Sequence, residues 1–219
     1  MMRNSFIITI FAALLAVTSV AAQAASKVES PDLVVKRTAE NVLGTIRANK
    51  QKFQHNPQAV FDLVQKDMAP NFDFDYAARL VLGRAWRDAT SKQRHEFIKA
   101  FQHYLVNSYA DALVKYSDSK LEVEPSRAQP GDERATVRSV ITPPDHAPIR
   151  VDYAMRKTDG GWKAFDVSAE GVSYVMSYRN TFASEVQQIG LDALIKRLQD
   201  RAHQKAKEAT NKAGGGSSQ

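Results

Sequence analysis

Two aspartates are the clearest candidates for acid–base chemistry in this sequence. Asp152 and Asp166 stand in segments whose alternating residues predict adjacent strands, so their carboxylates could approach each other. Carboxylates placed in this way can act as general acid and base. The same positions also suit ion pairs with Arg150, Arg156 or Lys163 on a solvated strand surface. We favour the ion pairs, and an enzyme that uses Asp152 or Asp166 as its base remains the alternative.

Other residues that commonly carry chemistry do not form a recognisable set. The chain has no cysteine. Its histidines are scattered without the spacing of a metal site, at His55, His95, His103, His146 and His203. The sequence also lacks a Gly-x-Ser-x-Gly motif, a phosphate-binding glycine loop and a dinucleotide fingerprint. We therefore expect no catalytic residues, no metal site and no cofactor.

The charge and the length of the chain indicate which partners and how many domains to expect. The 219 residues include 30 Lys and Arg against 24 Asp and Glu, for a formal net charge of +6. The basic residues are spread along the chain without a basic block or interleaved aromatics, so we expect no nucleic-acid partner. The length suits one domain with a sizeable core.

Residues 1–24 predict a signal peptide. Met1–Ser5 carries one positive charge, Phe6–Val20 is apolar, and Ala22-Gln23-Ala24 places small residues where a signal peptidase cuts. The apolar run of about 15 residues is shorter than the roughly 20 that a spanning helix needs. We expect cleavage after Ala24 and a periplasmic location, where a chain without cysteines depends on its core rather than on disulfides.

Residues 31–116 predict a helical subdomain. Caps and prolines mark helix starts near Pro31, Pro57, Asp73 and Ser91. The longest predicted helix runs from Ser91 to Tyr116 and has a broad apolar face rich in aromatic side chains.

Residues 119–168 predict a four-stranded antiparallel sheet. Apolar and polar residues alternate in four runs, Leu121–Glu124, Ala135–Ile141, Arg150–Arg156 and Trp162–Val167. Helical spacing returns over residues 172–202 with a break at Gly190, and residues 203–219 lack an apolar face and should be disordered. The fold class is α+β, a single domain over residues 25–202 in which helices pack on one face of a curved sheet. Its apolar interior could be filled or hollow.

Several stretches resemble one family, the Mla-type periplasmic phospholipid-binding proteins, also called the toluene-tolerance or MlaC family. The matching stretches are Asp73–Gly83, Trp86, Phe97–Leu105, Val151-Asp152-Tyr153, Gly161-Trp162-Lys163, Asp166-Val167, Glu170–Ser173, Tyr178-Arg179 and Leu191–Ile195. Together they cover roughly residues 31–198 in the order of the family.

The resemblance implies a soluble carrier rather than an enzyme. Such a carrier moves glycerophospholipid between an outer-membrane lipoprotein–porin complex and the substrate-receiving subunit of an inner-membrane ABC transporter, and so maintains outer-membrane lipid asymmetry. The resemblance also implies a sheet of the NTF2-like kind, with bound phospholipid as cargo in an apolar cavity between sheet and helices. An NTF2-like small-molecule enzyme and a periplasmic adaptor are the alternatives.

For each residue that could line the lipid slot, ordinary core packing is the competing interpretation. On the helical side we expect Leu80, Phe97, Phe101, Tyr104 and Leu105 to contact lipid, and on the sheet and its corner Val151, Tyr153, Phe165, Val167, Val172 and Val175. The phosphate should stay near the mouth, because burying it without donors is costly. Arg79, Arg84 or Arg179 could stand beside it.

The first testable prediction is that the exported protein begins after Ala24. Intact mass or N-terminal sequencing of the periplasmic form should show a chain that lacks residues 1–24. A periplasmic form that retains Arg3 would contradict the predicted cleavage.

Overall fold

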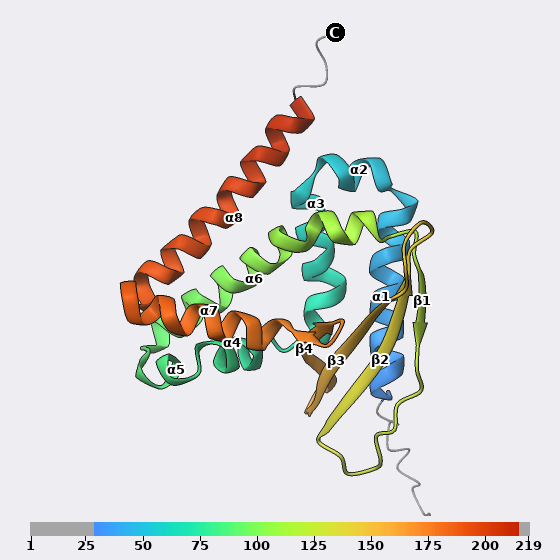
Figure 1. Cartoon of the computed structure of the whole chain (residues 1–219), viewed down its shortest axis with the longest axis horizontal. Coiled ribbons are helices and arrows are strands. Elements are labelled where there is room, and N and C mark those ends of the chain that lie inside the picture. Colours follow the sequence, from blue (N-terminus) through green and yellow to red (C-terminus); the bar gives the residue numbers. More distant parts are fainter. Residues whose placement is uncertain (1–28, 215–219) are drawn as a thin grey trace, which may run out of the picture.

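The structure, a computed structural model, describes residues 29–214. The predicted signal peptide lies outside these residues. Within them the chain is an α+β protein, with helices on one side and an antiparallel sheet on the other (Figure 1). None of the helices in this range is long and apolar enough to cross a membrane.

The first half of the chain is helical, as predicted. Its elements are α1 (Pro31–Ala48), α2 (Lys50–His55), α3 (Pro57–Leu63), a π-helical turn η1 (Val64–Met68), a 3-10 turn η2 (Ala69–Asn71), α4 (Phe74–Leu82), α5 (Arg84–Asp88) and α6 (Ser91–Lys115). α6 begins at Ser91 because Thr90 and Gln93 form a capping box, with each side chain bonded to the other residue's backbone N–H.

Two of the predicted helices are interrupted. The first breaks at Asn49, whose φ of −134° and ψ of 40° are not helical. The second loses its α-helical form after Leu63 and passes through η1 into η2, which contains Pro70. Proline has no backbone N–H to continue an α-helix, so the chain leaves the helix there.

The sheet has one strand more than predicted. Its strands are β1 (Lys120–Val123), β2 (Arg134–Thr142), β3 (Ile149–Thr158), β4 (Gly161–Ala169) and β5 (Val172–Ser173), paired antiparallel in that order. Val172 was expected in the last helical region but pairs with Ala169. The chain reverses between them because Glu170 and Gly171 both adopt positive φ, 49° and 80°, which is typical of a two-residue hairpin turn.

Two helices complete the fold, α7 (Tyr174–Ile189) and α8 (Leu191–Gly214), with the predicted break at Gly190. The prediction that the chain is disordered from residue 203 onward is wrong as far as Gly214, where α8 ends. Lysine and alanine are the commonest residues of this stretch and are strong helix formers, so it can stay helical without an apolar face. In Figure 1 this part of α8 extends beyond the other helices.

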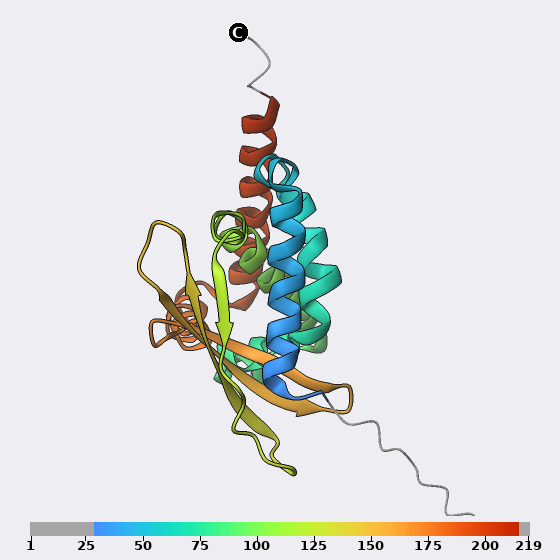
Figure 2. The ribbon, with the colours of Figure 1, turned by 90° about the vertical axis from the view of Figure 1, so that its right-hand side faces the viewer.

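Three clusters of buried side chains hold the layers together. One joins α4, α6, α7 and α8 around Phe97, Phe101 and Phe182, and a second joins α1, α3 and α6. The third fixes α1 to the sheet through Val34, Val35 and neighbours on β2–β4. Figure 2 shows α1 (blue) running between the strands and α3 (teal).

α4 is joined to β4 at Asp73. The Asp73 backbone N–H donates to the Ala164 carbonyl over 2.7 Å, and its carboxylate caps α4 by accepting from the Tyr76 N–H at 2.9 Å. The same carboxylate pairs with Arg156 of β3, whose guanidinium lies 4.7 Å from the Tyr76 ring centroid. One residue thus begins a helix and ties it to two strands.

Replacing Asp73 should destabilise the whole domain. Asp73→Ala removes the cap and the partly buried ion pair, and we expect it to lower the free energy of unfolding by about 2 kcal/mol. Asp73→Asn keeps an oxygen that can cap the helix, so it should lose about half as much. Urea denaturation measures both, and an Asp73→Ala variant with wild-type stability would show that this junction contributes nothing.

Candidate functional site

An apolar cavity of about 310 Å³ lies between the helices and the sheet. α6 forms one wall with Phe101, Leu105 and Tyr109, and the strands face it with Val151 and Tyr153. α7, η1 and the start of α4 close the remaining sides. The lining is almost entirely aliphatic and aromatic, so the space suits hydrocarbon rather than a polar metabolite.

Six of the eleven predicted site residues line this cavity. They are Phe101, Leu105, Val151, Tyr153, Val167 and Val175. The other five, Leu80, Phe97, Tyr104, Phe165 and Val172, lie elsewhere. The structure thus brings together the residues from α6, the sheet and α7, while contact with lipid itself stays a prediction.

Different local causes keep those five residues out of the cavity. Leu80 and Tyr104 pack beside the helical cluster in which Phe97 is completely buried, and Val172 on β5 is 59% exposed. Phe165 is displaced by a bulge, because the register shifts so that Met155 faces Ala164 and Ala154 faces Asp166. An inserted residue switches the faces of the strand, so Phe165 packs against Tyr76 instead.

Tyr153 shows why this interior is hollow rather than filled. Protein surrounds its side chain closely enough that burial raises the pKa of Tyr153. The side chain nevertheless retains accessible surface because it faces the cavity. A tyrosine in a close-packed core would have lost that surface.

Four tyrosines that were not predicted from the sequence also line the cavity. They are Tyr109 on α6, Tyr116 just after the end of α6, and Tyr174 and Tyr178 on α7. Tyr109 continues the i, i+4 row of Phe101 and Leu105, and that spacing could have identified it. Tyr174 and Tyr178 depend on the docking angle of α7, which the sequence does not encode locally.

The two candidate catalytic aspartates have separate structural partners. Asp152 pairs with Arg150, with the carboxylate 2.9 Å from the guanidinium. Asp166 accepts hydrogen bonds from the Ser173 hydroxyl and from the Val175 N–H, at 3.0 Å, and so holds the start of α7. Their strand positions are two residues out of register, a diagonal of about 7–8 Å between Cα atoms. In residues 29–214 no group of three histidine, aspartate or glutamate side chains could hold a metal ion.

The arginines expected near a head group do not line the cavity. Arg179 lies against Gly83 and donates to the Leu80 carbonyl at 3.5 Å, which stabilises the end of α4. Gly83 has a φ of 54°, and a Cβ there would meet the Arg179 guanidinium at 3.3 Å. Arg79 lines a separate open groove beside α4.

Comparison with known proteins gives a consistent assignment. Residues 36–200 match the family model described as MlaC protein. The intermembrane phospholipid transport system binding protein MlaC of Haemophilus influenzae is 28% identical over 178 residues, which are 80% of this chain and 83% of that protein. The toluene tolerance protein ttg2D of Pseudomonas putida is 30% identical over 165 residues, 75% of this chain and 76% of that protein.

A solved structure supports the same family assignment. The phospholipid-binding protein of Ralstonia solanacearum, determined in complex with a phospholipid, superposes with a TM-score of 0.75 at 30% sequence identity. The match covers 81% of this chain and 99% of that one. The family model, the relatives and the shared fold together show that the chain belongs to the MlaC family.

Proposed function

We propose that this protein is a soluble periplasmic carrier of glycerophospholipid. The apolar cavity between α6, α7 and the sheet is the observation that carries the proposal. Membership of the MlaC family supports it, because the relative of solved structure holds a phospholipid and the Haemophilus relative is named for intermembrane phospholipid transport. The bound lipid is cargo and not a cofactor.

The energetics of lipid transfer explain why a carrier needs such a cavity. A diacyl lipid has about 30 methylene groups, and each costs about 0.8 kcal/mol to expose to water, so full exposure would cost roughly 25 kcal/mol. A bilayer and an apolar slot shelter the chains about equally. The transfer therefore needs a closed slot and docking sites on the two membranes' protein complexes, but no catalyst.

The cavity must enlarge to accept a complete lipid. An apolar cavity of about 150 Å³ takes up one benzene molecule, so 310 Å³ has room for about a dozen carbons. The two chains of a diacyl lipid carry more than twice as many. The helices and the sheet therefore separate further when the cavity fills.

We infer the partners of this carrier from its membership of the MlaC family. The carrier would exchange lipid with an outer-membrane lipoprotein–porin complex and with the substrate-receiving subunit of an inner-membrane ABC transporter, and so maintain the asymmetry of the outer membrane. A binding protein cannot set the direction of flow by itself. Direction comes from relative affinities or from ATP hydrolysis by the transporter.

Native mass spectrometry of protein purified from the periplasm tests the proposal. We expect an additional bound mass that is extracted as glycerophospholipid and releases fatty acids on hydrolysis. Protein that emerges empty and takes nothing from phospholipid vesicles would contradict the carrier function.

The Tyr153→Asp substitution distinguishes a lipid slot from solid core. In a hollow site water can hydrate the new carboxylate, so the variant should fold, be exported and melt close to delipidated wild-type protein. It should emerge without phospholipid, because the charge lies where acyl chains would pack. Lys157→Asp, on an exposed position of the same strand, is the matched control and should keep its lipid. A folded Tyr153→Asp protein with its full lipid complement would show that Tyr153 lies outside the slot. An unfolded variant would show that Tyr153 belongs to the close-packed core.

A further inference from the structure

Two tyrosine hydroxyls meet at the wall of this otherwise apolar cavity. Tyr109 reaches from α6 and Tyr178 from α7, and their oxygens lie 3.0 Å apart. Both residues line the cavity. Burial raises the pKa of Tyr178, and its hydrogen bond with Tyr109 raises that pKa further, so the Tyr178 hydroxyl keeps its proton at neutral pH.

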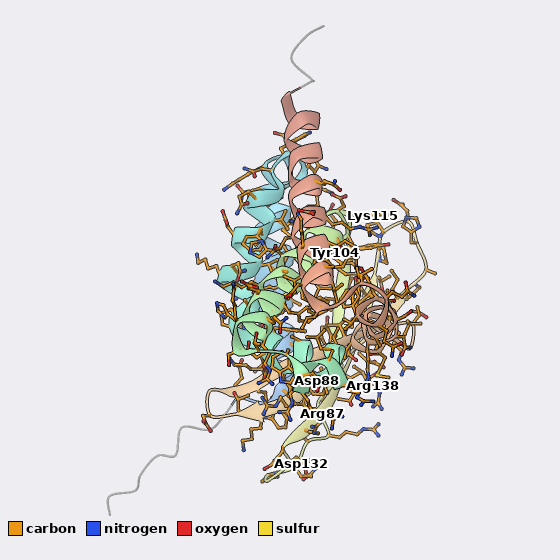
Figure 3. The ribbon with its side chains drawn as sticks, turned by 90° about the vertical axis from the view of Figure 1, so that its left-hand side faces the viewer. Arg87, Asp88, Tyr104, Lys115, Asp132 and Arg138 are labelled. Carbon is orange, nitrogen blue, oxygen red and sulfur yellow. The ribbon has the colours of Figure 1, made fainter. Side chains whose placement is uncertain are left out.

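A count of protons shows that this pair has a donor to spare. Each hydroxyl carries one proton, and the bond between the two oxygens uses only one of them. Two more tyrosines flank the pair, Tyr104 with its ring centroid 5.8 Å from that of Tyr178 and Tyr174 with its ring centroid 5.0 Å from that of Tyr109. Figure 3 shows Tyr104 in the middle of the helical layer. A hydroxyl row extended by either of them would still leave one proton unused, because each added oxygen brings a proton of its own. An acceptor in the cavity would draw the spare proton towards itself.

Tyr109 and Tyr178 share the cavity wall with other polar groups. The Asp166 carboxylate is already engaged, because it accepts from Ser173 and from the Val175 N–H. Tyr116, Tyr153 and Tyr174 bring further hydroxyls to the wall. Among these lining tyrosines, Tyr109 and Tyr178 are the pair whose hydroxyls lie within hydrogen-bond distance of each other, so their spare proton has a defined position.

The depth of the pair matches one part of a phospholipid. Tyr109 and Tyr178 are half-buried, whereas Phe101, Val106 and Ala77 of the same cavity are fully buried. If a lipid has its acyl chains among the fully buried lining residues and its phosphate in solvent, its ester groups lie between these two levels, at the depth of the tyrosine pair. The ester carbonyl is a hydrogen-bond acceptor and cannot donate, so it complements a wall that offers a donor.

We propose that Tyr109, positioned by Tyr178, donates a hydrogen bond to an ester carbonyl of the bound lipid and makes the carrier selective for ester-linked over ether-linked chains. This inference rests on the proposed carrier function and adds a chemical preference to it. An ether-linked chain has the same length and apolar area but lacks the carbonyl oxygen. It would leave the spare hydroxyl proton facing the lipid without an acceptor, which disfavours binding.

A competition experiment measures this preference. Delipidated protein is incubated with vesicles that contain equal amounts of a diacyl and a dialkyl phosphatidylglycerol of the same chain length, and native mass spectrometry reports the ratio of the two bound lipids. We expect wild-type protein to favour the diester by roughly tenfold, the ratio that one well-made hydrogen bond supplies. In Tyr109→Phe and in the double variant Tyr109→Phe/Tyr178→Phe the ratio should fall towards one.

The matched control is Tyr116→Phe. Tyr116 also lines the cavity and lies two helical turns beyond Tyr109, but it takes no part in the hydroxyl row, so this variant should keep the wild-type ratio. A wild-type ratio near one, or a preference that survives both phenylalanine variants, would overturn the inference while leaving the carrier function intact. Wild-type protein that takes up neither lipid would instead refute the carrier function and this inference with it.

Discussion

Two helices of this protein, α4 and α7, are joined at their N-termini to the same strand of the sheet, β4. Asp73 ties the start of α4 to this strand through the bond from its N–H to the Ala164 carbonyl, and Asp166 ties the start of α7 to it through the Val175 N–H. Both are polar contacts at helix N-termini, where unpaired N–H groups need an acceptor and negative charge is favoured. Between them the layers face each other with apolar side chains that do not fill the gap. The cavity follows from this arrangement. β4 fixes the orientation of α4 and α7 relative to the sheet, and the side chains between these layers do not fill the space.

This architecture explains why residues that suggested chemistry from sequence have structural roles. Asp166 positions a helix, Asp152 balances Arg150, and Arg179 covers the end of α4 against Gly83. These charged groups thus serve at the joints between elements. Among residues 29–214, Asp166 is the one charged residue that lines the cavity, and its carboxylate is already engaged with Ser173 and the Val175 N–H. Such an arrangement suits a protein that must receive an apolar molecule and release it unchanged, because a charge in the slot would have to be desolvated at each exchange.

Periodicity predicted most elements of the fold, but it could not predict features that depend on a single backbone conformation. The alternation over Trp162–Val167 placed Phe165 and Val167 on one face, but the bulge at Phe165 puts the two on different faces. The positive φ values at Glu170 and Gly171 create β5 where a helix was expected to start. On α6, Phe97 and Phe101 share one face by spacing, yet Phe97 is enclosed by its stacked neighbour Phe101 and by Phe182, while Phe101 reaches the cavity. Only the three-dimensional packing distinguishes such a core residue from a lining residue.

The central claim is that acyl chains occupy the space between α6, α7 and the sheet. A phospholipid with a photoreactive diazirine near the end of one acyl chain, loaded from vesicles and activated by light, tests this claim directly through peptide mapping of the cross-links. We expect cross-links to Phe101, Leu105 or Val106 on α6 and to Val151 or Tyr153 on β3, all of which vanish when unlabelled phospholipid is in excess. Cross-links confined to exposed residues such as Leu33, Met176 and Ile189 would contradict it, because the lipid would then lie on the surface and not within the fold.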